Sequence, residues 1–76
     1  MIRTKDEIIR FVESAIKGAI TYDEFNKAIG LQWWYDRVTA FNQIELLKDL
    51  QKYNPVQYQD RFEVLVEMLA LITNAK

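Results

Sequence analysis

The signals that start and stop helices constrain the fold of this chain more than any other feature. Three residues that commonly cap helix N-termini are each followed three positions later by Glu or Gln: Thr4 with Glu7, Thr21 with Glu24, and Asn54 with Gln57. In this arrangement the capping side chain accepts a hydrogen bond from a backbone N–H group that the first helical turn leaves unpaired. Gly18 and Gly30 supply stops, because glycine readily adopts the left-handed conformation that ends a helix.

Between these signals the apolar residues recur at the three- and four-residue spacing of a helix, and no segment alternates as a strand does. A break near Asn42 would divide the third segment into two shorter helices, and the pattern leaves this open. We predict an all-α fold, a compact bundle of four helices, one of them short, with no sheet, in a single domain spanning residues 1–76. The predicted helices cover about residues 5–17, 22–29, 32–52 and 55–73.

The third and fourth helices carry the most apolar residues. In the third, one stripe at helical spacing is expected to face the core, and its members are Trp34, Val38, Phe41, Ile44, Leu47 and Leu50. The fourth is apolar nearly all round, which is typical of a buried central helix or of an interface helix. We also expect hydrophobic staples at two helix starts, formed by Ile20 with Phe25 and by Tyr53 with Tyr58.

The composition argues against catalysis. The chain contains no histidine and no cysteine, which removes the commonest general base, the usual metal ligands and the thiolate nucleophile. Its one serine, Ser14, has no histidine to activate it, and two glycines cannot form a phosphate-binding loop. Asp60, Glu63 and Glu67 share one side of the fourth helix, which we interpret as a solvated face. We therefore expect no enzyme, no catalytic residue, no metal, no cofactor and no small-molecule substrate.

Charge and hydropathy indicate a cytoplasmic protein. The formal net charge is −1, and basic residues gather in no segment. The N-terminal residues are charged throughout and contain no apolar stretch typical of a signal peptide. The most apolar stretch, residues 64–72, contains Glu67 and is shorter than the roughly 20 residues that cross a membrane. We expect neither a membrane nor a nucleic acid as the main partner.

Residues 22–40 permit one alternative function. A short helix, the turn at Gly30 and Leu31, and a second helix resemble the spacing of a helix-turn-helix DNA-binding motif. The second helix would use residues 32–39 to read bases. Arg37 is its only basic residue before Lys48, and Asp36 would be repelled by phosphates. A helical corner within a bundle explains the same pattern.

The consecutive aromatic residues Trp33, Trp34 and Tyr35 suggest a binding surface. Successive side chains on a helix point about 100° apart, so these three span roughly 200° and cannot all enter one core. Trp and Tyr are enriched in protein interfaces. We predict a small non-enzymatic protein–protein interaction module, an adaptor, inhibitor or regulator, that binds a protein partner or a second copy of itself through Trp33, Tyr35 and Arg37. Its small size also fits a phage or mobile-element protein.

Overall fold

The computed structural model describes residues 4–31 and 34–75. This part of the chain forms helices and connecting turns only, which confirms the predicted all-α fold. The helices are α1 (Lys5–Lys17), α2 (Tyr22–Ile29), α3 (Trp34–Tyr53) and α4 (Pro55–Thr73). Their bounds lie within two residues of those predicted, and α3 continues through Asn42 without a break.

The predicted N-terminal caps are present at all three positions. The side-chain oxygen of each capping residue accepts a hydrogen bond from the backbone N–H group three residues later. The donor–acceptor distances are 3.3 Å for Thr4 and Glu7, 3.1 Å for Thr21 and Glu24, and 3.2 Å for Asn54 and Gln57. These caps satisfy donors that the first turn of a helix leaves unpaired, so local sequence fixes where three of the helices begin.

Two glycines end α1 and α2 in the same way. Gly18 and Gly30 have φ angles of 77° and 81°, in the left-handed region. After each, the next residue donates a backbone hydrogen bond five residues back, from Ala19 to Ser14 and from Leu31 to Asn26. This is the Schellman arrangement, in which the residue after the glycine often packs back against the helix. Leu31 does so and is almost fully buried.

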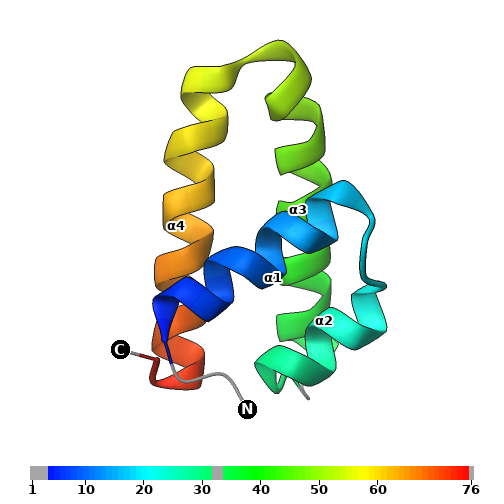
Figure 1. Ribbon diagram of the computed structural model, residues 1–76, viewed down its shortest axis with the longest axis vertical. Coiled ribbons are helices and arrows are strands. Elements are labelled where there is room, and N and C mark those ends of the chain that lie inside the picture. The colour runs from blue at the N-terminus through cyan, green and yellow to red at the C-terminus, as the bar shows by residue number, and fades with distance from the viewer. Residues whose placement is uncertain (1–3, 32–33, 76) are drawn as a thin grey trace.

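The helices form two layers (Figure 1). α3 and α4 run antiparallel as a long helical hairpin, and α1 crosses one face of this hairpin and packs on both of its helices. α2 packs on α1 and lies beside α3 on the same side of the hairpin. The molecule measures 32 × 23 × 22 Å.

One apolar cluster, between the hairpin and the layer of α1 and α2, forms the core. Its side chains come from all four helices and from Leu31. The largest fully buried members are Ile8, Val12, Phe25, Leu31, Ile44, Leu47, Leu65 and Leu69. Because each helix contributes residues to the same cluster, this core stabilises the whole chain as one unit.

The predicted inward stripe of α3 is confirmed at Ile44 and Leu47 only, because Trp34 and Phe41 are exposed and the remaining two members, Val38 and Leu50, are only partly buried. Trp34 is 75% exposed and Phe41 is also exposed, whereas α3 buries Ala40, Ile44 and Leu47. The apolar residues of α3 lie on several sides of the helix, so their spacing does not select one face. Small Ala40 allows close approach of the neighbouring helices, and the burial of its side of α3 directs Trp34 outward.

Two further expectations need revision. Tyr53 is exposed, whereas Tyr58 is partly buried with its ring 5.8 Å from that of Phe62, so the predicted staple between Tyr53 and Tyr58 is absent. α4 is not buried all round, because it places one side in the core and leaves Val64 and Leu71 exposed on the other. Of the two interpretations of α4, a buried central helix is therefore wrong.

The two sides of α4 predict different responses to the same substitution. Leu69 is 0% exposed and Leu71 is 80% exposed. Leu69→Ala should lower the free energy of unfolding by about 2–5 kcal/mol, because it leaves a cavity in the core. Leu71→Ala should change it by at most about 0.5 kcal/mol. Urea denaturation of both variants at low protein concentration, followed by circular dichroism, measures the difference. Similar losses for both leucines would contradict this division of α4.

Candidate functional site

The side of the helical hairpin opposite α1 carries no covering element among the described residues. We call this surface the hairpin face. Among the residues that the structure describes, it carries six of the nine exposed large hydrophobic ones, together with the partly buried Leu50 and Met68. Its members are Tyr35, Leu46, Leu50 and Tyr53 on α3 and Val64, Met68, Leu71 and Ile72 on α4.

On α3, contacts with α2 show which side is open. Lys48 reaches Tyr22 of α2, and Phe41 packs on the same tyrosine. Leu46 precedes Lys48 by two residues and is therefore rotated about 200° from it, pointing away from α2. Tyr35 and Tyr53 lie eleven residues before and seven after Leu46, which brings them to nearly the same side of the helix.

On α4, contacts with α1 define the opposite side in the same way. Val66 lines a surface hollow together with Ile9 and Lys5 of α1. Val64 precedes Val66 by two residues and points away from α1 by the same rotation of about 200°. Val64, Met68 and Leu71 follow one another at spacings of four and three residues, as residues do along the contact seam of packed helices.

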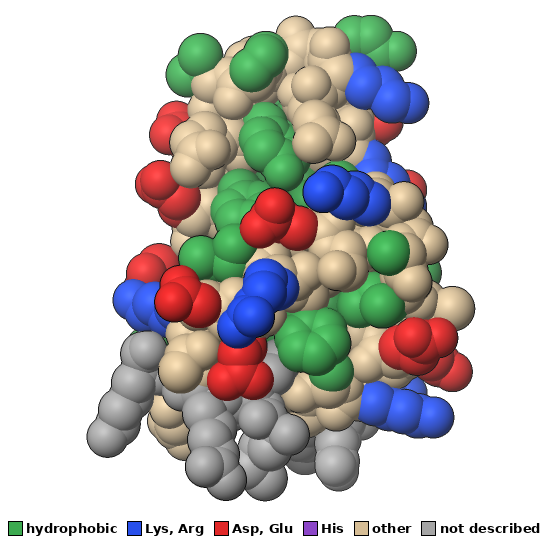
Figure 2. Space-filling view, viewed as in Figure 1, with side chains coloured by type: hydrophobic (Ala, Val, Ile, Leu, Met, Phe, Trp, Pro, Cys, Tyr) green, Lys and Arg blue, Asp and Glu red, His purple; other side chains and the backbone are tan. Residues whose placement is uncertain are grey.

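Charged side chains border the hairpin face on α4, where Asp60, Glu63 and Glu67 line the same surface hollow as Val64, Met68 and Leu71. Arg61 is also exposed, and it lies three residues before Val64, about one turn earlier on the same side of α4. On the opposite, α1-covered face, lysine, arginine and carboxylate side chains are also spread among the hydrophobic ones (Figure 2). What distinguishes the hairpin face is its number of exposed large hydrophobic residues.

The structure separates the residues that the sequence suggested as a binding site. Trp33 lies outside the described residues. Tyr35 is 71% exposed and belongs to the hairpin face. Arg37, two residues further along α3, points to a different side, and its Nε donates a hydrogen bond of 3.1 Å to the carbonyl oxygen of Leu31. Arg37 thus stabilises the connection between α2 and α3. Sequence reasoning missed most of the hairpin face, because Leu46 and Met68 cannot be told from core residues by spacing alone.

The suggested acidic side of α4 makes ordinary surface contacts. Glu67 accepts a hydrogen bond of 2.8 Å from Lys5 of α1, and Glu63 accepts one of 3.1 Å from Gln59. Both partners in the Lys5–Glu67 ion pair are exposed, so the pair contributes little to stability. Within residues 4–31 and 34–75, no group of three or more acidic side chains is placed to hold a metal ion.

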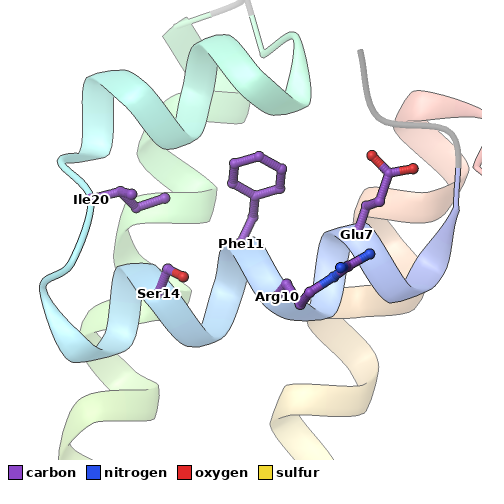
Figure 3. A pocket seen from close by; sticks show the side chains of 5 residues that line it. All are labelled: Glu7, Arg10, Phe11, Ser14 and Ile20. Carbon is purple, nitrogen blue, oxygen red and sulfur yellow. The ribbon is translucent and has the colours of Figure 1, made fainter.

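A hollow of about 370 Å³ lies on the outer side of α1, next to the turn that leads into α2 (Figure 3). Phe11 and Ile20 supply its apolar surface, and Glu7, Arg10 and Ser14 border it. The guanidinium of Arg10 donates to the carbonyl oxygen of Asp6 on its own helix. The hollow therefore combines a small apolar floor with surface polar groups and indicates no particular chemistry.

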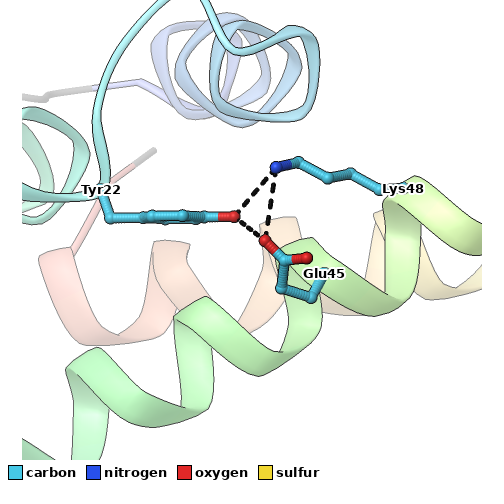
Figure 4. A network of polar contacts seen from close by, with 3 residues as sticks. All are labelled: Tyr22, Glu45 and Lys48. Atoms are coloured by element: carbon cyan, nitrogen blue, oxygen red, sulfur yellow. Dashed lines mark hydrogen bonds and ion pairs between the residues drawn. The ribbon is translucent and has the colours of Figure 1, made fainter.

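A polar network joins α2 to α3 (Figure 4). The Tyr22 hydroxyl donates to the carboxylate of Glu45, and the Lys48 ammonium donates to both, at 3.0 Å to Tyr22 and 3.3 Å to Glu45. The Tyr22 ring lies 4.4 Å from that of Phe41, measured between centroids. This network attaches the short helix α2 to the hairpin on the side away from the hairpin face.

The network shifts the pKa of each member. Burial of the Tyr22 hydroxyl, and its hydrogen bond to Glu45, raise the pKa of Tyr22. The hydrogen bond from Tyr22 lowers the pKa of Glu45, and the hydrogen bond to Tyr22 raises the pKa of Lys48. All three shifts favour a neutral phenol between a charged carboxylate and a charged ammonium, which is the protonation state of a structural contact at neutral pH.

Comparisons with known proteins add no further constraint on function. No protein family, no curated protein and no solved structure matches the chain. Within the part of the chain that the structure describes, none of the helices has the length and apolar character needed to span a bilayer.

The network predicts a loss of stability at alkaline pH. Because the pKa values of Tyr22 and Lys48 are raised on folding, the folded state binds more protons than the unfolded state above about pH 10. Its contribution is complete below that pH and is lost as pH rises through the raised pKa values. In urea denaturation between about pH 8 and 12, Tyr22→Phe should therefore reduce the fall in stability. Tyr53→Phe controls for the loss of one phenol. An unchanged pH dependence in Tyr22→Phe would contradict this role.

Proposed function

We propose that this chain is a small non-enzymatic protein–protein interaction module whose binding site is the hairpin face. The observation that supports this most strongly is the distribution of exposed apolar side chains, most of which lie on one side of α3 and α4. Apolar groups scattered singly over a surface are ordinary, but a contiguous patch spanning two helices is typical of an interaction site.

The aromatic residues of the hairpin face also suit an interaction surface. Two aromatic residues, Tyr35 and Tyr53, lie towards opposite ends of the hairpin face. Tyrosine suits this position because it buries a large ring while keeping its hydroxyl hydrated.

The start of α3 favours a protein partner over DNA. Its described exposed residues include Trp34 and Tyr35, and the one basic residue among its first residues, Arg37, donates to the Leu31 carbonyl. A recognition helix needs side chains that bind base edges and cations that bind phosphates. We therefore keep a cytoplasmic adaptor, inhibitor or regulator as the proposed role, with a protein as its partner.

Site-specific photocrosslinking tests this function. A benzophenone amino acid in place of Tyr35 is placed on the hairpin face, and the protein is irradiated in cells that carry its gene. We expect a covalent adduct with a protein, which should be lost in Val64→Lys because the charge disrupts the apolar surface. The adduct should persist in Val56→Lys, which changes the same residue type at the exposed tip of the hairpin.

Two results would contradict the proposal. One is the absence of any adduct from Tyr35, Leu46 and Val64 when each carries the crosslinker in turn. The other is salt-dependent binding of a DNA duplex that Arg37→Ala abolishes, which would favour the helix-turn-helix interpretation.

A further inference from the structure

We infer that the partner of the hairpin face presents an amphipathic helix with a basic flank, which packs lengthwise along the exposed side of α4. This inference rests on the proposed function, because it names the chemistry of the partner for the same surface. Two properties of α4 support it: an apolar seam at the spacing of packed helices, and a row of carboxylates along one flank of that seam.

The apolar seam consists of Val64, Met68 and Leu71, which follow one another at spacings of four and three residues. In the heptad notation for packed helices, abcdefg, these residues take the d, a and d positions, whose side chains insert between those of a neighbouring helix. All three line one surface hollow, and every described residue that lines it belongs to α4. The seam runs along the helix axis, which is the form that a partner helix fits.

The acidic flank lies beside this seam. Asp60 and Glu67 are seven residues apart, so they occupy the same heptad position, g, on one side of the seam. Glu63 lies between them in the chain, and Glu63 and Glu67 also line the hollow that α4 forms with Ile9 of α1. Figure 2 shows carboxylate side chains following one another along the edge of the molecule where α4 lies. Charges at g positions select the partner of a helix, so this flank favours lysine or arginine opposite it.

Contacts within α4 leave the charge of Asp60 and Glu63 uncompensated. Side chains on a helix meet those three and four residues away. Around Asp60 these positions hold Val56, Gln57, Glu63 and Val64. Glu63 accepts its hydrogen bond from the neutral amide of Gln59. Neither carboxylate therefore meets a cation on its own helix.

The ion pair of Glu67 leaves room for a second cation. Lys5 binds Oε1 of Glu67, and the Glu67 side chain remains 61% exposed. A carboxylate has several acceptor sites, so it can bind another ammonium or guanidinium group. Arg61 lies about 100° around α4 from Asp60, on the seam and not on the flank. With three carboxylates and the one ammonium of Lys5, the flank keeps a formal charge of −2.

A basic amphipathic helix satisfies both parts of this surface. A purely basic segment would leave the apolar seam in contact with water. An uncharged apolar helix would cover the seam, but it would remove water from Asp60 and Glu67 without supplying a partner, which costs free energy. A helix with an apolar stripe and a basic flank covers the seam and places a cation opposite each carboxylate.

Synthetic peptides as long as α4, 19 residues, test this inference. The lysine peptide repeats heptads with leucine at a and d and lysine at e and g, and the glutamate peptide has glutamate in place of each lysine. Measured by fluorescence anisotropy at one fixed salt concentration, the lysine peptide should bind at least about tenfold more tightly than the glutamate peptide.

Two further peptides keep the lysines and separate the seam from the charge. One has glutamine in place of every leucine, and the other has a central proline that interrupts the helix. Each should bind at least about tenfold more weakly than the lysine peptide, because the first cannot cover the seam and the second cannot follow it. Leu71→Ala in the chain itself should also weaken binding of the lysine peptide.

Charge reversal on α4 locates the binding site. The double variant of Asp60→Lys and Glu67→Lys should reverse the preference, so that the glutamate peptide binds more tightly than the lysine peptide. The matched control combines Asp23→Lys on α2 with Asp49→Lys on α3, two exposed positions outside this surface. It changes the net charge by the same amount and should keep the preference for lysine. Circular dichroism establishes that both variants are folded.

Three results would overturn the inference. The first is equal binding of the lysine and glutamate peptides to the intact chain. The second is the same change of preference in both double variants, which would show an effect of net charge alone. The third is undiminished binding of the peptide that lacks leucine or of the peptide that contains proline.

Photocrosslinking from Tyr35 separates this inference from the proposed function. An adduct that is lost both in Val64→Lys and in the double variant of Asp60 and Glu67 supports both. An adduct that is lost in Val64→Lys and retained in that double variant would overturn the basic flank and leave the hairpin face as a binding site. The absence of every adduct, together with no binding of the lysine peptide, would overturn both.

Discussion

A helical hairpin has two faces, and in the described part of this chain the other helices cover only one of them. α1 crosses one face of α3 and α4, and α2 lies beside α3 on that same side. The buried residues of all four helices therefore meet in a single layer, while Leu46, Val64 and Leu71 remain outside it. Small domains bury a smaller fraction of their surface than large ones, and a contiguous exposed apolar surface is typical of an interaction site.

The helix bounds could be predicted from the sequence because the signals that fix them are local. Thr4, Thr21 and Asn54 each act on backbone groups within three residues, and Gly18 and Gly30 end helices through their own backbone conformation. None of these signals depends on the rest of the fold. Bounds that depend on such interactions can be recognised in one sequence without any relative for comparison.

The rotation of each long helix could not be predicted in this way. α3 and α4 carry apolar residues on several sides, so spacing does not show whether Trp34 or Ala40 points inward. The choice depends on which sides α1 and α2 cover, which is a property of the assembled chain. For the same reason, the sequence indicated an apolar surface at Tyr35 but not its continuation to Leu46 and Met68. The link between Arg37 and the carbonyl of Leu31 also depends on the turn between α2 and α3.

The polar network of Tyr22, Glu45 and Lys48 explains how an eight-residue helix is held in place. α2 is too short to be stable alone, and its attachment to α3 combines the buried Phe25 with this network at the surface. The network lies on the side of α3 away from the hairpin face. The two sides of the hairpin therefore differ: one holds α2, and the other is the side that we propose for binding.

The most direct test of the hairpin face is paramagnetic relaxation of methyl protons by a soluble gadolinium chelate, measured at a concentration where the partner is bound. In the isolated chain Val56 and Val64 are similarly exposed, at 74% and 59%. We expect strong relaxation of the Val56 methyl groups and clear protection of those of Val64, because the proposed partner covers the hairpin face. Equal relaxation of both valines with the partner bound would show that the partner does not cover that face.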